Sequence, residues 1–252
     1  MTKIILHGCF GQMGHAVQKA AQQTKGFEFV AGIDAKPEAG PLDFPVFKTL
    51  SVCDINTDAV IDVSVASAVP NLIDWCCNRK LPLVLCTTGI SDETSVLVKQ
   101  ASEIIPIFKS ANMSLGINFM VSLLERASAV LGAEGYNIEI IEKHHNQKVD
   151  APSGTALMLA NAMNKDGKYT LVTDRSQRRQ KRPDNEIGIS SMRGGTIVGE
   201  HSVIFAGQDE VIEITHSAYS KDVYAVGALK AAEFISRQKH GLYNMHDLLN
   251  AK

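Results

Sequence analysis

Aromatic residues, cysteines and long apolar runs are scarce in this chain of 252 residues. Aromatic side chains make up 6% of it, with a single tryptophan, and there are five cysteines. The cysteines lie between Cys9 and Cys86, without a CxxC pair or the spacing of metal ligands. An odd number of scattered thiols argues against a disulfide scaffold, predicts no metal site and favours a reducing compartment. The adjacent Cys76 and Cys77 are expected to pack on a helix.

No apolar stretch reaches the length that crosses a membrane, because Asp62, Pro70 and Asp74 interrupt the best candidate. The opening residues MTKIILHGCFG contain an apolar run too short for a signal peptide. The formal net charge of -2 gives no general attraction to nucleic acid or to an anionic membrane. We therefore expect a cytoplasmic protein with neither a membrane nor a nucleic-acid partner.

One run of positive charge stands out against this balance. No aromatic residues interleave with it, as they do in sites for single-stranded nucleic acid, so a solvated loop is expected. The run consists of Arg175, Arg178, Arg179, Lys181 and Arg182.

The first half of the chain alternates short apolar runs with helical patterns, which is typical of βαβ units and a parallel sheet. The segment from residue 34 to 57 is less regular. Strands are predicted at Lys3–Leu6, Phe27–Ile33, Ala59–Val65, Leu83–Thr87 and Ile105–Phe108, with helices at Gln12–Gln23, Pro70–Asn78 and Asp92–Glu103.

The pattern changes from Asn118 onward, where several segments alternate polar with apolar residues as half-exposed strands do. These features predict an α+β region with a mainly antiparallel sheet. A long helix is expected at Phe119–Leu131, strands at Asn137–Lys143, Ile187–Met192, Thr196–Phe205 and Val211–Ser217, and a final helix at Asp222–Arg237.

A glycine-rich loop directly follows the first predicted strand. Gly8, Gly11 and Gly14 are spaced GxxGxxG rather than the usual GxGxxG, between a strand and a helix. Glycines let the backbone approach a pyrophosphate, which then sits at the helix amino terminus. The second strand ends at Asp34, which is placed to bind the ribose hydroxyls of NAD. A tight turn without a ligand is the alternative.

Two further loops follow strands of the predicted parallel sheet at their carboxyl ends, where ligands collect in open α/β sheets. The first is Cys86-Thr87-Thr88-Gly89, and the second is Ser110-Ala111-Asn112-Met113. Both are suited to complete a dinucleotide pocket, although each alone is also ordinary loop chemistry.

The segment EKHHNQKVDAPSGT, from Glu142 to Thr155, concentrates proton-transfer and anion-binding chemistry. Either His144 or His145 can exchange a proton near neutral pH, and Lys148 adds a positive charge. Pro152 is expected in the first turn of a helix, whose backbone N–H groups bind anions. The segment therefore predicts a proton donor beside a carboxylate or phosphate site, with a hydrated polar loop as the alternative.

Taken together, these motifs resemble the 4-hydroxy-tetrahydrodipicolinate reductase family, also called dihydrodipicolinate reductase. The resemblance covers nearly the whole chain and is carried by GCFGQMG, CTTG, SANMSLGIN, HHNQKVDAPSGTAL, RGGTIVGEH and ITHSAYSKDVYAVGAL. It implies a Rossmann-type dinucleotide-binding domain at 1–115 plus 222–252 and a substrate-binding and oligomerisation domain at 116–221. It also implies a homotetramer built through the second domain's sheet.

The activity that the resemblance implies is the NADH- or NADPH-dependent reduction of a cyclic imine dicarboxylate in lysine and diaminopimelate biosynthesis. His144 then looks like the catalytic acid and Lys148 like a second proton donor. His145, Gly154 and Thr155 look like substrate contacts. The implied cofactor contacts are Gly8, Cys9, Phe10, Gly11, Gln12, Met13, Asp34, Cys86, Thr87, Thr88, Ser110, Ala111, Asn112 and Met113.

The chain departs from the family pattern in its cofactor loops. Gln12 stands where arginine is usual, and Cys86 replaces the usual glycine before Thr-Thr. Ala35 occupies the place where some members carry an arginine for the NADPH phosphate. Because Asp34 repels that phosphate and only Lys36 is near to offset it, NADH is predicted to serve at least as well as NADPH.

Two other functions remain compatible with the residues alone. One is a reductase of a different small dicarboxylate or aldehyde, since a glycine loop does not choose the substrate. The other is a non-catalytic sensor that binds NAD(H) and a partner protein, although a sensor has no need for the intact acid, cation and anion-binding turn.

Overall fold

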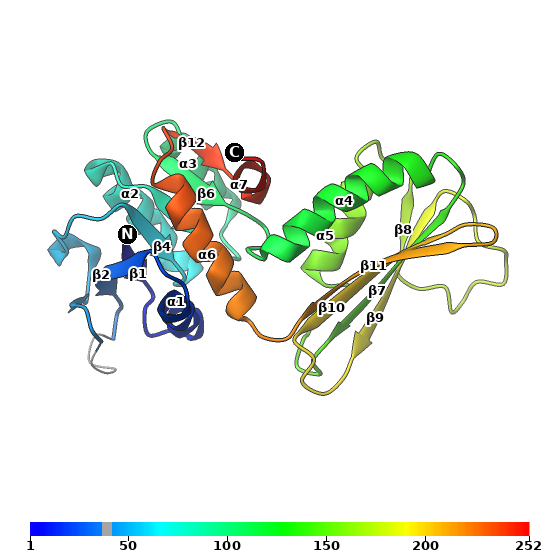
Figure 1. The fold of residues 1–252 in the computed structure, drawn as a ribbon, viewed down its shortest axis with the longest axis horizontal. Helices are drawn as coiled ribbons and strands as arrows, with labels where there is room; N and C mark the ends of the chain where they lie inside the picture. Colours follow the sequence, from blue (N-terminus) through cyan, green and yellow to red (C-terminus); the bar gives the residue numbers. More distant parts are fainter. Residues whose placement is uncertain (37–41, 252) are drawn as a thin grey trace. The chain divides into compact units, whose positions relative to one another are not determined.

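The aliphatic runs of the first half form a seven-stranded parallel sheet in the computed structural model, which describes residues 1–36 and 42–251 (Figure 1). The strand order is β12-β6-β5-β4-β1-β2-β3, and every pairing between described strands is parallel. The strands are β1 (Thr2–His7), β2 (Phe27–Ile33), β3 (Val46–Phe47), β4 (Ala59–Asp62), β5 (Leu83–Leu85), β6 (Pro106–Lys109) and β12 (Gly241–Tyr243).

Helices cover both faces of this sheet, as in doubly wound Rossmann-type folds. Ile4 and Leu6 of β1 join one apolar cluster, whereas Ile5 joins the other. The first cluster includes helices α1 (Gln12–Gln23) and α6 (Asp222–Ile235), and the second includes α2 (Val69–Arg79) and α3 (Asp92–Ala101). Other helical segments among the described residues of this half and of the carboxyl end are α7 (Met245–Asn250) and the short 3-10 helices η2 (Leu50–Val52) and η3 (Ala66–Ala68).

The second half forms a five-stranded sheet in the order β11-β10-β7-β9-β8. Strand β10 runs antiparallel to both neighbours, while β9 is parallel to β7 and β8, so the sheet is mixed with more antiparallel than parallel residue pairs. The elements are α4 (Leu115–Leu131), β7 (Asn137–His144), α5 (Gly154–Met163), β8 (Thr170–Val172), β9 (Glu186–Arg193), β10 (Gly199–Ala206) and β11 (Val211–Ala218).

Alternation along β7 places its even-numbered residues on a buried face. Ile138 and Ile140 pack there with Leu124 of α4 and Leu159 of α5. The next two residues on the same face, Glu142 and His144, are therefore carried to the end of a rigid strand.

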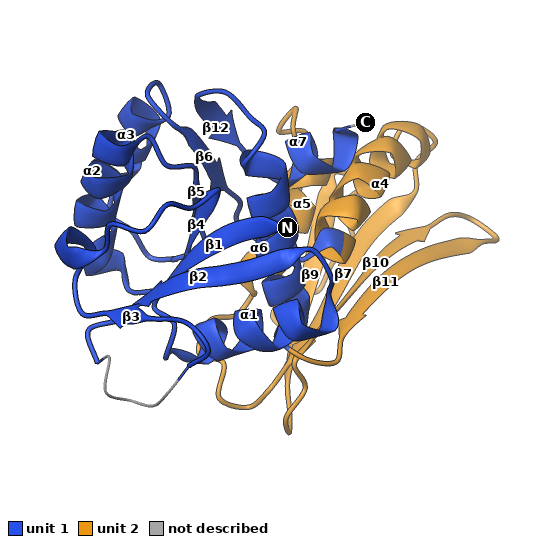
Figure 2. Cartoon of the chain, turned by 60° about the vertical axis from the view of Figure 1, so that its left-hand side comes forward, with its two compact units in different colours: residues 1–115, 221–252 blue, residues 116–220 orange. Residues whose placement is uncertain are grey.

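The chain divides into two compact units (Figure 2). Unit 1 comprises residues 1–115 and 221–252 and holds the parallel sheet, and unit 2 comprises residues 116–220 and holds the mixed sheet. The final long helix α6 belongs to unit 1. Among the described residues, no helix is long and apolar enough to cross a membrane.

The long elements expected from hydrophobic periodicity are confirmed, and the differences concern ends and short pieces. Helix α4 begins at Leu115 rather than Phe119, and β10 begins at Gly199 rather than Thr196. Pro152 lies before the α5 N-cap, Ser153, rather than inside the first turn. The short strands β3, β8 and β12 and helix α7 were not expected, because two- to six-residue elements carry too little periodicity.

The arginine run of residues 175 to 182 is not simply a solvated loop. Arg175 binds both oxygens of Glu139, at 2.8 and 2.9 Å, and Arg182 Nε lies 2.9 Å from Glu139 Oε1. Arg178 pairs with Glu186, which is almost fully buried. The expectation is wrong for these three arginines, because two glutamates on the sheet need positive partners.

Candidate active site

The glycine loop of unit 1 is packed so closely that side chains are excluded from it. Gly8 has φ +84°, and a Cβ there would lie 3.0 Å from the backbone of Ser64. A Cβ on Gly14 would lie 2.3 Å from the Gly8 carbonyl oxygen. Helix α1 begins after Gly11, which offers no capping side chain. The loop is therefore a bare backbone cradle at a helix amino terminus, which fits a pyrophosphate.

Asp34 lies beside this cradle at the carboxyl end of β2. Its carboxylate accepts hydrogen bonds from the backbone N–H of Phe10 at 3.0 Å and of Lys36 at 3.1 Å. A pocket of about 590 Å³ opens between the loops after β1, β2 and β4. Its lining includes the predicted cofactor residues Gly8, Phe10, Gly11, Gln12 and Asp34.

A second pocket, of about 360 Å³, continues along the carboxyl ends of β4, β5 and β6. It shares Val63 and Ser64 with the first pocket, so the two form one groove. It is lined by the other predicted cofactor residues except Cys9, namely Met13, Cys86, Thr87, Thr88, Ser110, Ala111, Asn112 and Met113. An extended dinucleotide fits this groove, with the acidic residue at one end and the strand-end loops at the other.

A buried carboxylate ties three of the groove's loops together. Asp62, at the end of β4, is fully buried and lies 2.8 Å from His7 Nδ1. It also accepts hydrogen bonds from the hydroxyls of Ser64 and Thr87, both at 2.6 Å. The ends of β1, β4 and β5 are thus held by one side chain, whose role the sequence did not suggest.

Neither cysteine of the cofactor loops is chemically activated. Cys9 packs in the apolar core and lines neither pocket, and burial raises its pKa to about 11. Burial also raises the pKa of Cys86 well above its usual value. Both therefore remain neutral thiols near neutral pH. All five cysteines are free, which agrees with the absence of a disulfide scaffold.

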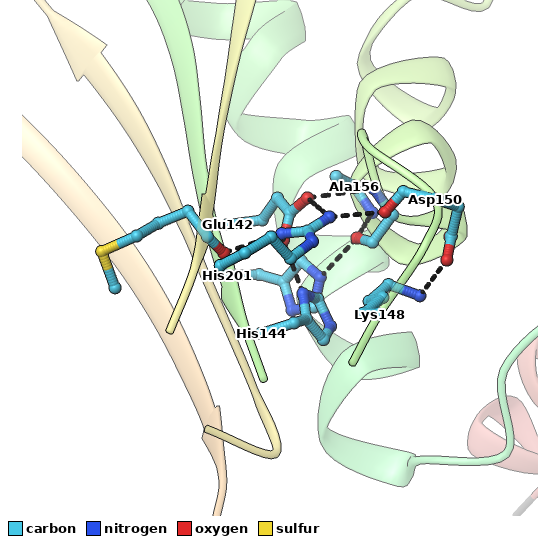
Figure 3. Close-up of polar contacts among 9 residues, drawn as sticks. Glu142, His144, Lys148, Asp150, Ala156 and His201 are labelled. Atoms are coloured by element: carbon cyan, nitrogen blue, oxygen red, sulfur yellow. Dashed lines mark hydrogen bonds and ion pairs between the residues drawn. The ribbon is translucent and has the colours of Figure 1, made fainter. Parts of the chain in front are cut away.

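The carboxylate of Glu142 is the centre of a polar cluster in unit 2 (Figure 3). Arg193, at the end of β9, donates to both Glu142 oxygens, at 2.8 Å to Oε2 and 2.7 Å to Oε1. His144 Nδ1 lies 2.5 Å from Oε2. Because an ionised carboxylate only accepts, Nδ1 carries a proton and the Nε2 atom of His144 is left for chemistry.

The start of helix α5 is bound to the same cluster. The Ser153 N–H donates to Glu142 Oε1 at 3.1 Å. The Ser153 hydroxyl caps α5 by accepting from the Ala156 N–H at 3.1 Å, and it lies 3.0 Å from His201 Nε2. The His201 and His144 rings meet edge to face, with centroids 5.1 Å apart (Figure 3).

The other predicted substrate residues lie in the same part of unit 2. Gly154 and Thr155 form the first turn of α5, and Lys148 pairs with Asp150 at 2.8 Å. His145 follows His144 at the end of β7 and is partly exposed. Unit 2 therefore brings all five of its predicted site residues to one end of the sheet. No cluster of metal-ligating residues occurs among the described residues.

Burial and hydrogen bonds shift two pKa values in this cluster. Burial opposes ionisation of Glu142, but hydrogen bonds from Arg193, Ser191 and His144 outweigh it and hold its pKa at about 2. Burial, reinforced by the charge on His144, lowers the pKa of His201 to about 4. Near neutral pH the cluster thus contains an anionic Glu142 and an uncharged His201.

Sequence reasoning missed four residues of this cluster. Glu142 precedes His144 by two, a strand spacing that puts both on one face, and that signal was available. Arg193, Gly199 and His201 lie within RGGTIVGEH, but nothing in their spacing indicated a contact with the histidine segment. A Cβ on Gly199 would lie 3.1 Å from His144 Nε2, so this glycine keeps that atom accessible.

The parallel sheet of unit 1, with its glycine loop and strand-end groove, is typical of a Rossmann-type, nicotinamide-dependent oxidoreductase. The family model "Dihydrodipicolinate reductase, N-terminus" matches residues 2–113, and "Dihydrodipicolinate reductase, C-terminus" matches residues 116–249. The chain belongs to the dihydrodipicolinate reductase family.

Curated relatives of this chain are similar over their full length. A 4-hydroxy-tetrahydrodipicolinate reductase of Caldanaerobacter subterraneus subsp. tengcongensis is 53% identical over 251 residues, covering 99% of this chain and 98% of that protein. A protein of the same name from Clostridium novyi is 48% identical over 253 residues, with both chains fully covered.

Solved structures agree on the fold. The dipicolinate-bound dihydrodipicolinate reductase from Paenisporosarcina sp. TG-14 has a TM-score of 0.80 at 22% identity, with 97% of each chain covered. A probable dehydrogenase from Thermotoga maritima has a TM-score of 0.62 at 11% identity, covering 98% of this chain and 92% of that one.

Proposed function

We propose that this chain reduces 4-hydroxy-tetrahydrodipicolinate to tetrahydrodipicolinate in lysine and diaminopimelate biosynthesis, with His144 as the proton donor. The observation that carries the role of His144 is its hydrogen bond to the buried Glu142 beside the start of α5. Family membership and the names of relatives at 53% and 48% identity support the reaction.

Loss of the hydroxyl group of 4-hydroxy-tetrahydrodipicolinate as water gives a ring with a C=C bond conjugated to the imine. A reduced nicotinamide held by the groove of unit 1 would supply a hydride to the end of that conjugated system. The carbanion-like or enamine carbon that results needs a proton, and His144 delivers it from Nε2. Its Nδ1 atom stays hydrogen-bonded to Glu142 throughout, so the imidazolium is stabilised before transfer and the ring keeps its orientation.

The two carboxylates of the substrate require positive partners close to this acid. The first turn of α5, with Gly154 and Thr155, presents backbone N–H groups and the positive end of the helix dipole. Lys148 and His145 add side chains that bind anions, and Lys148 is also suited to act as a second proton donor. These contacts hold the ring in one orientation for reaction.

The two units have different proposed roles, because they contain different predicted binding residues. We assign residues 1–115 with 222–252 to dinucleotide binding and residues 116–221 to substrate binding and assembly. Asp34 is suited to accept the ribose hydroxyls of NADH and disfavours the extra phosphate of NADPH, which Lys36 offsets only in part. NADH therefore serves at least as well as NADPH.

The assembly that we propose is a homotetramer formed through the sheet of unit 2. The face of that sheet opposite the helices exposes apolar side chains, with Ile141 37% and Met192 44% exposed. Large apolar side chains left on an open sheet face are commonly covered by another copy of the chain.

The decisive experiment is a steady-state assay of His144→Gln with freshly prepared 4-hydroxy-tetrahydrodipicolinate. We expect kcat to fall by about 10²–10⁴-fold, the usual contribution of a general acid. The Kd for NADH should be unchanged, because His144 is not part of the unit 1 groove. Full activity in this variant would refute the assignment.

A second variant tests the accessibility of the same atom. Gly199→Ala places a methyl group 3.1 Å from His144 Nε2, where the reacting carbon must approach. We expect a loss of about tenfold or more in kcat, since small misplacements of reacting groups are costly. Gly194→Ala is the matched control in the preceding turn, because a Cβ there meets nothing within 4 Å.

A further inference from the structure

Each oxygen of Glu142 has a separate task, although both belong to one side chain. Oε2 holds the proton donor, through His144 Nδ1 at 2.5 Å. Oε1 holds the start of the anion-binding helix, through the Ser153 N–H at 3.1 Å. Arg193 spans the two oxygens, at 2.8 and 2.7 Å, and so fixes the plane of the carboxylate. The side chain is fully buried, so water does not replace these partners.

We propose that Glu142 is a positioning residue that holds the acid His144 and the substrate-binding turn of α5 in a fixed relation to each other. This inference rests on the proposed function, since it assigns the partners of the proton donor. Rotation of the carboxylate would move both groups together, and Arg193 prevents that rotation. The acid and the carboxylate-binding turn are thus preorganised before substrate binds.

Ser153 joins the α5 turn to the sheet a second time. Its hydroxyl lies 3.0 Å from His201 Nε2, and both side chains are nearly fully buried. His201 is opposite Glu142 in the register of β10 and β7. The turn is therefore held at Ser153 by its N–H and by its hydroxyl, from two adjacent strands.

A carboxylate is required at this position, and an amide of equal size is not a substitute. Arg193 N–H groups donate to both oxygens of Glu142, with a second N–H donor at each oxygen, from His144 or from Ser153. Glutamine would turn one of these oxygens into an NH2 group that faces donors. At least one of the hydrogen bonds that Glu142 accepts from Arg193, His144 or Ser153 must then break, and His144 loses its anionic neighbour.

The test is Glu142→Gln, assayed across pH. The charged or titratable groups that face His144 are Glu142 on its own strand, His201 on β10 and Arg193 on β9. Glu142→Gln removes the anion that is bound to His144 Nδ1 and leaves the positive charge of Arg193 nearby. We expect kcat to fall at least about tenfold, with its decline at high pH moving to lower pH because the anion bound to Nδ1 is lost. The KM for substrate should rise while the Kd for NADH stays constant.

Glu139→Gln is the matched control. Glu139 lies on the same strand and is likewise bound through both oxygens to an arginine, Arg175, but on the opposite face of the sheet. A general effect of losing a glutamate–arginine pair would appear in both variants. We expect the pH profile and substrate KM of Glu139→Gln to match those of the wild type. Equal changes of the pH profile and KM in Glu139→Gln and Glu142→Gln would overturn the inference.

Ser153→Ala tests the contacts of the α5 turn separately from those of His144. It also provides a test of the inference if Glu142→Gln does not fold. It removes the hydroxyl contacts with His201 and the Ala156 N–H but leaves the backbone bond to Glu142. We expect a higher substrate KM with the pH profile of kcat unmoved. An unchanged KM would count against the inference.

The experiments distinguish the failure of this inference from the failure of the proposed function. If the wild type does not turn over 4-hydroxy-tetrahydrodipicolinate, the proposed function fails. The His144 Nδ1 proton can then be observed by NMR in the wild type and in Glu142→Gln, and a change of its chemical shift in the variant supports the hydrogen bond between the two side chains. If the wild type is active and Glu142→Gln keeps its pH profile and KM, the inference alone is wrong.

Discussion

The buried His201 should make unit 2 less stable as the solution becomes acidic. Its pKa is lowered from 6.5 to about 4 in the folded protein, chiefly by burial and then by the charge of His144. As pH falls below 6.5, the unfolded chain binds a proton that the folded chain does not bind. Stability is therefore present in full above pH 6.5 and is lost as pH falls toward 4.

The size of the effect follows from the shift. A pKa difference of one unit corresponds to about 1.4 kcal/mol, so this histidine accounts for about 2 kcal/mol between pH 7 and pH 5. Glu142 acts at lower pH, because its pKa is lowered from 4.5 to about 2 and its contribution is lost as pH falls from 4.5 through 2. Measurements above pH 5 thus isolate the histidine.

The assay compares the wild type with His201→Gln, whose side-chain NH2 can replace the contact of Nε2 with Ser153. The groups facing His201 are His144, Glu142, His216 and Lys148, and all remain in the variant. His216 also has a lowered pKa, caused first by burial, and its effect cancels in the comparison.

Hydrogen–deuterium exchange of the β7 and β10 amides, corrected for intrinsic rates, gives the free energy of opening of unit 2 at each pH. Fluorescence of the single tryptophan reports only unit 1, where Trp75 lies. We expect the wild type to lose about 2 kcal/mol more than His201→Gln between pH 7 and pH 5. Equal losses in the two proteins would refute the reasoning.

Two further predictions concern the cofactor and the assembly. The kcat/KM for NADH should equal or exceed that for NADPH, because Asp34 is expected to bind the ribose hydroxyls and to repel the extra phosphate of NADPH; a preference for NADPH above about tenfold contradicts this. Sedimentation equilibrium should give a mass about four times the chain's 27.3 kDa. Ile141→Glu should reduce that mass by charging the exposed sheet face, and a wild-type monomer at micromolar concentration contradicts the tetramer.

Much of unit 1 was predictable, because its signals are local. Aliphatic runs such as Ile4 to Leu6 are buried on both faces of a parallel sheet, so each run alone indicates its strand. Gly8 and Gly14 follow the first strand directly; Gly8 has a positive φ, and a Cβ on Gly14 would meet the Gly8 and Cys9 backbone within the same loop. The predicted groove residues line its pockets, except Cys9, which lies in the core.

Unit 2 was less predictable at the level of partners. The elements β7, β9 and β11 are long enough to show alternation, and the structure confirms them. Arg175 and Arg182 looked solvated because their partner Glu139 lies 36 and 43 residues earlier in the chain. The partner of Arg178, Glu186, is nearer in sequence, but their pairing depends on how the loop folds back onto β9. Sequence periodicity states which face a residue occupies, but it does not state which residue is opposite.

The sequence by itself determined the chemical types at the active site, because His144, Lys148 and the Ser153–Thr155 turn are neighbours in the chain. It also determined the dinucleotide loop, whose glycines are required by local backbone geometry. Only the tertiary structure decided how the acid is held. Arg193 and Glu142 are 51 residues apart, and His201 and Ser153 are 48 apart. Such contacts depend on strand register in a mixed sheet, which the order of residues does not show.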